Sequence, residues 1–198
     1  MLPPGRIGRA LEIACAEGHF TVKLATRTDH LIAADISQTA LGRAAKRCSN
    51  MKNMRFVQLD LNRDTLPGRF ELIVCSEMLY YVGGQDALKA IARKLAKAVE
   101  PWGYLLTAHA YIIKDDPDYT GFVGWDNVSF GAKVIGETFA GISSLRLVRE
   151  LRTPLYRIQL FKHIPRIYSY FYRSTPEIIE SKQQPTELLP EVAVHVKW

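Results

Sequence analysis

Short, mainly apolar runs alternate with amphipathic segments through the first half of the chain, and this alternation is the strongest constraint on its fold. The runs cover residues 8–14, 31–34, 54–59, 70–75 and 104–108, and their length and flanking turn residues are typical of buried strands. Helical periodicity covers 19–27, 37–47 and 85–99. Strands joined by helices run parallel, and unbroken apolar runs indicate a sheet covered on both faces. The sequence therefore predicts an α/β fold with a mainly parallel sheet.

The second half of the chain has a different character. Residues 114–127 are polar and aromatic and are predicted to form a long loop, followed by a helix over 131–139. Two strand-like runs, 145–152 and 155–161, are separated by only two residues, and so short a connection cannot join parallel strands. We therefore predict an antiparallel C-terminal strand pair that closes the sheet.

These patterns suggest a domain boundary. Residues 1–164 are predicted to form one domain, and the aromatic, charged and proline-containing stretch 165–198 is predicted to be a tail or a linker to a further domain. The first predicted strand starts almost at Met1, so the chain is interpreted as a piece of a longer protein.

Composition excludes several classes of protein. Three scattered cysteines without a Cys-x-x-Cys pair argue against a disulfide framework and against a structural zinc site, and no metal site is predicted. No apolar run is long enough to cross a membrane, and the N-terminus does not resemble a signal peptide. A reducing, cytoplasmic location is therefore predicted.

The positive charge is concentrated in one segment. The formal net charge is +6, and residues 146–173 alone carry seven basic residues and one acid. The simplest interpretation is a solvated face and a basic tail. The alternative is attraction to an anionic surface or partner, such as a membrane, an acidic polysaccharide, a nucleic acid or an adjoining domain.

Small and acidic residues gather where the predicted strands end, which is where open α/β sheets bind ligands. The first strand leads into small residues that end at Gly18, so a ligand can approach the main chain and the start of the next helix. Asp35 ends the second strand, where a carboxylate can accept hydrogen bonds from ribose hydroxyls. Asp60 ends the third, where it can accept one from an exocyclic amine. Together these positions predict a nucleoside site.

A dinucleotide dehydrogenase would use a similar sheet. Its Gly-x-Gly-x-x-Gly fingerprint is missing, because residues 14–18 read Ala-Cys-Ala-Glu-Gly and have the wrong spacing. Three stretches instead resemble motifs of class I S-adenosylmethionine (SAM) dependent methyltransferases, which have a Rossmann-like sheet. They are Leu-Glu-Ile-Ala-Cys-Ala-Glu-Gly-His-Phe at 11–20, residues 70–82, which start with the fourth apolar run, and Pro-Trp-Gly-Tyr-Leu at 101–105.

The resemblance covers about residues 9–163, with one departure in the first motif. Ala14 and Ala16 stand where the class usually has its first two glycines, and alanine is tolerated there if the backbone φ is negative. Within the class, Ser-Glu-Met-Leu-Tyr-Tyr at 76–81, with Asp35 and the helix starting at 131, resembles the nodulation methyltransferase (NodS-like) group. Members of that group N-methylate a de-N-acetylated glucosamine on a chito-oligosaccharide.

The resemblance implies SAM-dependent methyl transfer to a small-molecule or saccharide acceptor, with the amine or hydroxyl of an amino-sugar favoured. Alternatives are another small metabolite as acceptor, or a degenerate domain that acts as a binding or scaffold module, which Ala14 and Ala16 motivate. Nucleic-acid methylation is disfavoured, because no Asn/Asp-Pro-Pro-Tyr/Phe motif follows the fourth strand.

The resemblance also implies roles for individual residues. The cofactor is expected to contact the residues at the strand ends, namely Glu12, Ala14, Ala16, Gly18, Asp35, Ile36, Asp60, Leu61 and Ser76. Glu12 would order the first loop near the methionine moiety, and Ile36 and Leu61 would enclose the adenine. Gly18 as a plain turn glycine and Ile36 and Leu61 as plain core residues remain alternatives.

Three residues are candidates for catalysis. Glu77 would bind or deprotonate an acceptor amine, Tyr80 would shape the acceptor pocket with Tyr81, and His109 would serve as general base for a hydroxyl acceptor. A local structural hydrogen bond is the alternative for Glu77, and a purely structural role is the alternative for His109. Tyr111, Tyr119 and Trp125 are predicted to form an acceptor wall.

Overall fold

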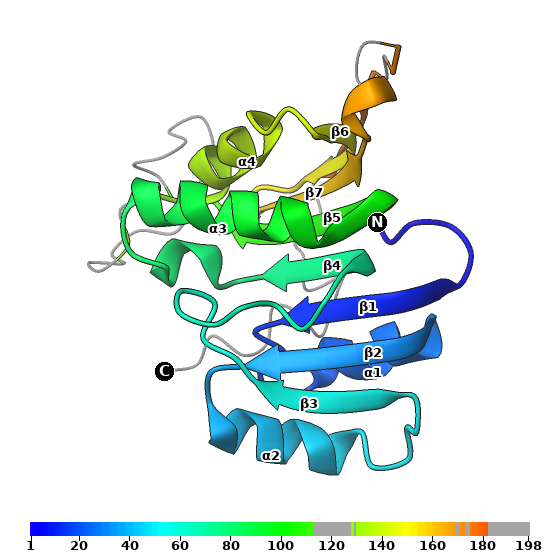
Figure 1. The fold of residues 1–198 in the computed structure, drawn as a ribbon. Helices are drawn as coiled ribbons and strands as arrows, with labels where there is room; N and C mark the ends of the chain where they lie inside the picture. The colour runs from blue at the N-terminus through cyan, green and yellow to red at the C-terminus, as the bar shows by residue number, and fades with distance from the viewer. Residues whose placement is uncertain (113–127, 129, 169–170, 173–174, 182–198) are drawn as a thin grey trace.

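The computed structural model describes residues 1–112, 128, 130–168, 171–172 and 175–181 (Figure 1). An eight-stranded sheet has the order β3-β2-β1-β4-β5-β7-β6-β8. Its strands are β1 (Ile7–Ile13), β2 (Thr28–Asp35), β3 (Met54–Gln58), β4 (Phe70–Ser76), β5 (Val99–Ala110), β6 (Leu145–Arg152), β7 (Tyr156–His163) and β8 (Glu177–Glu180). The helices are α1 (His19–Thr26), α2 (Gln38–Arg47), α3 (Gln85–Ala98) and α4 (Ala132–Ala140), with 3-10 turns η1 (Leu79–Tyr81) and η2 (Arg166–Tyr168).

The strand directions confirm the predicted sheet. β1 to β5 pair in parallel, whereas β7 pairs antiparallel with both β5 and β6. The chain runs outward from β1 to β3 and then returns to β4 on the other side of β1. The order of the strands therefore reverses between β1 and β4, and the carboxyl ends at this point form the crevice where such sheets bind ligands.

Both faces of the central strands are buried, which explains the unbroken apolar runs. Along β4, Ile73 belongs to the core cluster beneath α3 and α4, whereas Leu72 and Val74 belong to the cluster on the α1 face. In Figure 1, α3 and α4 lie in front of the sheet and α1 lies behind it. The amphipathic pattern of α3 matches this arrangement, because the residues of its predicted apolar face are buried: Leu88, Ile91, Ala92 and Leu95.

The structure corrects the boundary between the helix predicted at 85–99 and the strand predicted at 104–108. α3 ends at Ala98, and β5 begins at once with Val99, so Pro101, Trp102 and Gly103 lie within the strand. The register with β4 shifts between Phe70 and Leu72, and this irregularity accommodates the extra residues. Val99 fits both the apolar face of the helix and a buried strand, so periodicity alone could not separate the two elements.

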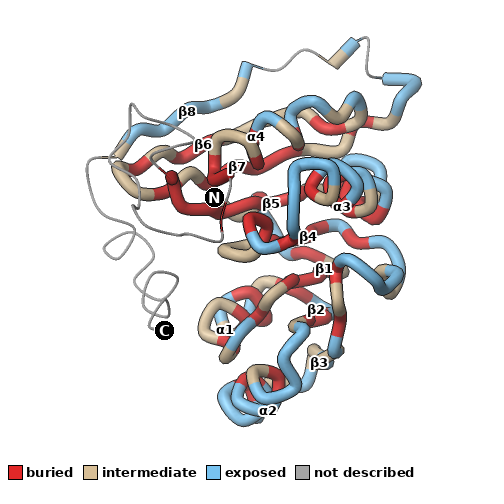
Figure 2. The backbone as a smooth tube through the Cα atoms, turned by 90° about the vertical axis from the view of Figure 1, so that its left-hand side faces the viewer, coloured by how far each residue is buried: buried red, intermediate tan, exposed pale blue. Residues whose placement is uncertain are grey.

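The sheet also continues beyond the predicted domain end at residue 164. β8 pairs in parallel with β6 at the edge of the sheet, and its four residues are exposed (Figure 2). Residues 177–180 of the predicted tail therefore belong to the sheet, and the rest of the boundary stays a prediction. The predicted loop at 114–127 lies outside the described residues. Among the helices of the described residues, none combines the length and the apolar character needed to cross a membrane.

Candidate cofactor and acceptor site

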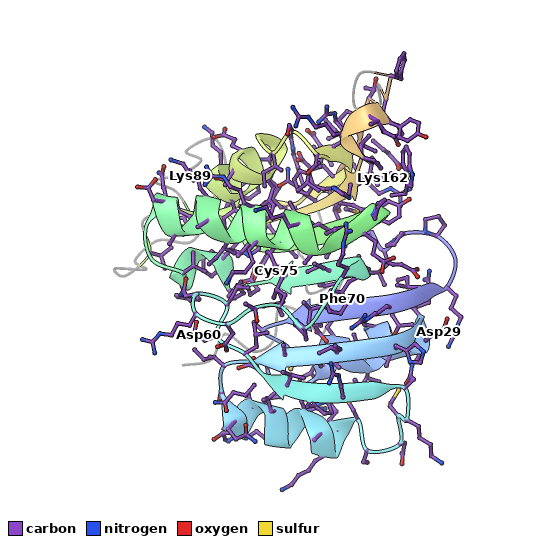
Figure 3. All side chains as sticks on the ribbon, in the orientation of Figure 1. Asp29, Asp60, Phe70, Cys75, Lys89 and Lys162 are labelled. Atoms are coloured by element: carbon purple, nitrogen blue, oxygen red, sulfur yellow. The ribbon has the colours of Figure 1, made fainter. Side chains whose placement is uncertain are left out.

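A pocket of about 220 Å³ opens at the carboxyl ends of the central strands. Residues from β1, β2, η1 and the segments that follow β2, β3 and β4 line it: Ile13, Ala14, Asp35, Ile36, Leu59, Asp60, Leu61, Asn62, Met78, Tyr81 and Val82. Figure 3 labels Asp60 at this edge of the sheet and Asp29 at the opposite edge. Five predicted cofactor residues thus come together in one pocket: Ala14, Asp35, Ile36, Asp60 and Leu61.

The loop after β1 adopts a left-handed backbone at three positions. Ala14 has φ 58°, Ala16 has φ 47° and Gly18 has φ 81°. The condition under which alanine is easily accommodated, a negative φ, is therefore not met at either alanine. A left-handed conformation costs a residue with a Cβ atom roughly 1–2 kcal/mol, so the loop keeps the shape of a glycine-rich loop at the expense of strain.

This strain predicts that glycine at positions 14 and 16 stabilises the protein. Glycine removes the left-handed penalty of roughly 1–2 kcal/mol but loses about 0.4–1 kcal/mol through its freedom in the unfolded chain. Each substitution, Ala14→Gly and Ala16→Gly, is thus expected to raise the free energy of unfolding by roughly 0.5–1 kcal/mol, measured by thermal unfolding. The matched control is Ala87→Gly within α3, which is expected to destabilise the protein. A lower unfolding temperature in the double glycine variant would contradict this explanation.

Asp35 joins two parts of the pocket. Its Oδ2 accepts a hydrogen bond from the backbone N–H of Ala16 at 2.9 Å, and its Oδ1 accepts one from Ser37 at 2.8 Å. Ser37 in turn caps α2, since its Oγ accepts a hydrogen bond from the N–H of Ala40. A carboxylate has about four lone-pair positions, so the oriented Asp35 side chain retains acceptor capacity for ligand hydroxyls.

The segment after β3 forms the opposite side of the pocket. Asp60 Oδ1 accepts a hydrogen bond from the N–H of Asn62 at 2.9 Å, and Asp60 Oδ2 lies 3.5 Å from Arg63 Nε. Ile36 is 62% exposed at the rim, whereas Leu61 is buried. An exposed apolar side chain and a buried one therefore flank a pocket whose polar groups include two carboxylates and the Asn62 amide. Asn62 had not been expected from the sequence.

Glu12 is buried in β1 beneath the loop. Its Oε2 and the nearby Thr21 Oγ1 accept or donate no hydrogen bond among the described residues. Burial raises the pKa of Glu12 to about 8, the nearby Thr21 hydroxyl opposes the rise, and the Asp35 carboxylate adds to it. Burying a carboxyl oxygen that has no hydrogen-bond partner is unfavourable, so the buried position of Glu12 requires an explanation.

Gly18 has a structural role whatever it binds. It is the N-cap of α1. A Cβ atom at this position would lie 3.1 Å from the Ala44 Cα atom of α2. Gly18 therefore allows α1 and α2 to pack closely, and its left-handed φ independently favours glycine.

Glu77 and two tyrosines form a cluster next to the pocket. Glu77 directly follows β4 with φ 54°, and its Oε2 accepts hydrogen bonds from the hydroxyls of Tyr80 and, at 3.4 Å, Tyr156. Its Oε1 is buried and accepts no hydrogen bond among the described residues. Burial raises the pKa of Glu77 to about 7, and the two tyrosine hydroxyls and the backbone N–H of Ala110 oppose the rise. The ring of Tyr81, which lines the pocket, contacts the Tyr80 ring edge-to-face.

Tyr156 was not foreseen from the sequence. It is the first residue of β7 and pairs with Ala110 at the end of β5. Thr153 forms the tight connection between β6 and β7, because its N–H and Oγ both contact Tyr156 backbone atoms. The predicted hairpin was the signal that could have placed the first residue of β7 at this edge of the sheet.

His109 lies behind this cluster rather than in the pocket. The ring is buried, its Nε2 accepts a hydrogen bond from the Leu79 N–H at 3.3 Å, and it contacts the Tyr80 ring edge-to-face. Burial lowers the pKa of His109 to about 3, so the ring is neutral. Ser76 Oγ donates a hydrogen bond to the Ala108 carbonyl at 3.4 Å.

The predicted acceptor wall is described only in part. Tyr111 is buried in the core, and Tyr119 and Trp125 lie outside the described residues. No group of three or more His, Cys, Asp or Glu side chains that could hold a metal occurs within the described part of the chain.

The sheet order, the antiparallel end strands and the pocket at the switch point together define a class I methyltransferase fold. A model of the nodulation protein S (NodS) family matches residues 2–112. The chain therefore belongs to the NodS family, and the sequence-based assignments of fold and family are confirmed.

Relatives of known name and structure agree with this assignment. Nodulation protein S of Rhizobium tropici is 32% identical over 55% of this chain and 46% of its own length, and that of Sinorhizobium fredii is 30% identical over 55% and 50%. The chain thus spans about half the length of the curated relatives it matches. The crystal structure of the N-methyltransferase NodS from Bradyrhizobium japonicum, in complex with S-adenosyl-L-homocysteine (SAH), has a TM-score of 0.69 at 24% identity over 80% of this chain and 79% of that one.

The residues present fit the cofactor that this fold class uses. The pocket combines a backbone-oriented carboxylate at Asp35 with apolar side chains on two sides. The buried Glu12 Oε2 and Thr21 Oγ1 lack partners beside the same loop. Unpaired buried polar atoms next to a pocket fit a ligand that brings polar or cationic groups of its own.

Proposed function

We propose that this protein is a SAM-dependent methyltransferase whose acceptor is the amine of an amino-sugar or of an oligosaccharide that contains one. The observation that carries the proposal is the buried Glu77 carboxyl group, which keeps one oxygen without a partner at the end of β4, beside the pocket. Membership of the NodS family supports it, as does the N-methyltransferase activity in the name of the Bradyrhizobium japonicum protein.

The cofactor residues are proposed as follows. Asp35 accepts hydrogen bonds from the ribose hydroxyls, Asp60 accepts one from the adenine amine, and Ile36 and Leu61 enclose the adenine ring. The remaining contacts come from the loop after β1 and from the end of β4: Glu12, Ala14, Ala16, Gly18 and Ser76. When bound, SAM supplies a methyl group that is already activated on a sulfonium.

The protein then has to hold a neutral amine and remove one proton. Glu77 does both, because its free Oε1 can accept a hydrogen bond from the amine and its pKa of about 7 lets it take up a proton near neutral pH. Tyr80 and Tyr156 hold the carboxylate through Oε2. His109 is assigned a positioning role instead of a base role, because its Nε2 lone pair is already used by Leu79.

The test is a methylation assay with a matched acceptor pair. The protein is incubated with SAM and either a de-N-acetylated or a fully N-acetylated chito-oligosaccharide, and the masses of the products are measured by mass spectrometry. We expect one methyl group on the de-N-acetylated compound and none on its partner. Methylation of both oligosaccharides would show that the acceptor group is a hydroxyl and not the amine. SAH binding without transfer to any saccharide would favour another small metabolite, and no binding of SAH would favour the scaffold module that the strained Ala14 and Ala16 suggest.

Cofactor binding is expected to depend on pH through Glu12. Its pKa of about 8 in the free protein means that the side chain is protonated at pH 6.5, so a ligand whose ammonium group pairs with the Glu12 carboxylate must displace a proton. SAH affinity should therefore rise with pH, by up to about tenfold per unit, and level off above about pH 8. Calorimetry in buffers of different ionisation enthalpy measures the released proton.

The control for this prediction is Glu12→Gln, which should bind SAH more weakly and without the pH dependence. The same shift has a consequence for stability. Because the pKa in the folded state lies above the ordinary value of 4.5 for a glutamate, the contribution of Glu12 to stability is fully present below about pH 4.5 and is lost as the pH rises through about 8. Glu12→Gln should flatten this slope in the free protein. An unchanged slope would contradict the assignment.

A further inference from the structure

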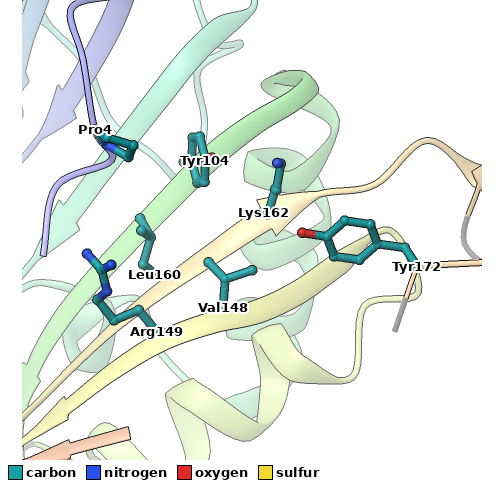
Figure 4. Close-up of a pocket in the computed structure, with 7 residues that line it drawn as sticks. All are labelled: Pro4, Tyr104, Val148, Arg149, Leu160, Lys162 and Tyr172. Carbon is teal, nitrogen blue, oxygen red and sulfur yellow. The ribbon is translucent and has the colours of Figure 1, made fainter. Parts of the chain in front are cut away.

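A second pocket lies at the other end of the sheet from the candidate active site. It has a volume of about 190 Å³ and lies over β5, β7 and β6 (Figure 4). Val148 and Leu160 form its apolar floor, Tyr104 and Tyr172 stand at its sides, and Arg149 and Lys162 bring positive charge. Pro4 completes the lining, and no residue is shared with the first pocket.

Lys162 is surrounded by aromatic rings. Its Nζ lies 5.5 Å from the ring centre of Tyr104, 5.7 Å from that of Trp102 and 5.8 Å from that of Tyr172. These rings attract the ammonium but do not neutralise it. Among the described residues, no carboxylate forms an ion pair with Lys162. Arg149 pairs with Glu177 through Nε at 2.6 Å, and a guanidinium has five N–H donors.

Two irregularities of the backbone build this pocket. The register between β6 and β7 shifts between Leu147 and Arg149. As a result, the consecutive residues Val148 and Arg149 both line the pocket, although neighbours in a regular strand point to opposite faces. Trp102 has φ 67°, which is strained for a bulky residue, and its half-exposed ring lies against Tyr168 and over Lys162. Strain that holds a side chain in place is a feature of functional sites.

The structure also shows which charges of the basic segment 146–173 are paired with a carboxylate. Arg152 and Arg157 both pair with the buried carboxylate of Glu150, and Gln159 donates to the same group. These two arginines are therefore compensated within the sheet. Of the other basic residues in the described part of the segment, Arg149 and Lys162 line the second pocket, whereas Arg146 donates hydrogen bonds to the backbone carbonyls of Ser143 and Leu145.

We propose that this pocket binds a small organic anion, namely a molecule with a single ring that carries a carboxylate or phosphate group. The anionic group pairs with Lys162 Nζ and Arg149, and the ring of the ligand lies on Val148 and Leu160 between the rings of Tyr104 and Tyr172. The volume of the pocket limits the ligand to about one ring, well below the size of a drug-like ligand. The site is separate from the cofactor pocket and does not depend on the proposed methyltransferase activity.

Calorimetric titration at low salt tests the proposal with four probes: phenyl phosphate, glucuronate, inorganic phosphate and glucose. We expect saturable binding of one or both ring-bearing anions, weaker binding of inorganic phosphate and none of glucose. The phenyl phosphate and glucuronate arms distinguish an aromatic phosphate from an acidic sugar as the source of the ligand chemistry. Saturating SAH should leave the affinity unchanged, because the two pockets share no residue.

Variants locate the binding. Lys162→Gln should weaken it roughly tenfold or more, because a charged hydrogen bond is lost, whereas Lys89→Gln removes the same charge from the exposed surface of α3 and should have no effect. Thermal unfolding of both variants checks that the fold is intact. Three results would overturn the proposal: no binding of any anion up to about 10 mM, equal binding of inorganic phosphate and the ring-bearing anions, or competition with SAH.

Discussion

Replacing Glu77 by glutamine is expected to lower kcat for methyl transfer by roughly 10²–10⁴-fold, the usual effect of losing a general base. Glutamine has nearly the same shape and can still accept the Tyr80 hydroxyl hydrogen bond, but it cannot take up the amine proton. SAH affinity should be unchanged, because Glu77 does not line the cofactor pocket. The variant should also unfold at a higher temperature at pH 8, because it removes a buried carboxyl group whose pKa is raised to about 7.

The pH profile separates a base from a merely structural residue. In the natural protein, kcat should rise with pH through about 7 as Glu77 loses its proton, and this limb should be missing in Glu77→Gln. Tyr156→Phe removes one hydroxyl that opposes the rise of the Glu77 pKa, so the limb should move to higher pH. A Glu77→Gln variant that keeps its activity and its pH limb would show that the proton leaves by another route.

Replacing Asp35 by alanine is expected to weaken SAH binding by roughly 10²–10³-fold. In the proposed binding mode, the substitution removes hydrogen bonds from the ribose hydroxyls, and a hydrogen bond to a charged acceptor is worth about 1.5–3 kcal/mol. It also leaves the backbone N–H groups of Ala16 and Ser37 without their acceptor, so the loop after β1 loses its link to α2. Calorimetric titration with SAH measures the loss directly.

The matched control lies on the same strand. Asp29→Ala removes an exposed carboxylate at the opposite end of β2, where Asp29 pairs with Arg6, and an exposed ion pair contributes about 0–1 kcal/mol. This variant should bind SAH as tightly as the natural protein. If Asp35→Ala bound equally well, the ribose assignment would be wrong, and the pocket would have to hold a different ligand or the same one in another orientation.

The parts of the fold that could be predicted are those with a local signal. The central strands are buried on both faces, so each contains an unbroken apolar run, as residues 72–75 show. The Thr153-Pro154 connection was short enough to require an antiparallel pair. β8 has only four exposed residues and no apolar pattern, and its place beside β6 is set by pairing between distant segments.

The candidate site divides in the same way. Asp35 and Asp60 could be placed from the sequence because Asp35 ends β2 and Asp60 follows two residues after β3, both at the carboxyl edge of the parallel strands. Tyr156 could not, because it is 79 residues from Glu77 and meets it only through strand pairing. The positive φ values of Ala14 and Ala16 were also hidden, since alanine gives no sign of a left-handed backbone.

The unpaired Glu12 and Thr21 atoms have a consequence for the lifetime of the protein in a cell. A ligand that supplies their missing partners binds the folded chain and not the unfolded one, so the unfolded fraction falls as the free ligand concentration rises. Proteases and chaperones act on that fraction, and changes of one or two kcal/mol alter abundance several-fold. The steady-state amount of this protein is therefore expected to follow the supply of its cofactor, with poorly supplied cells clearing the empty form.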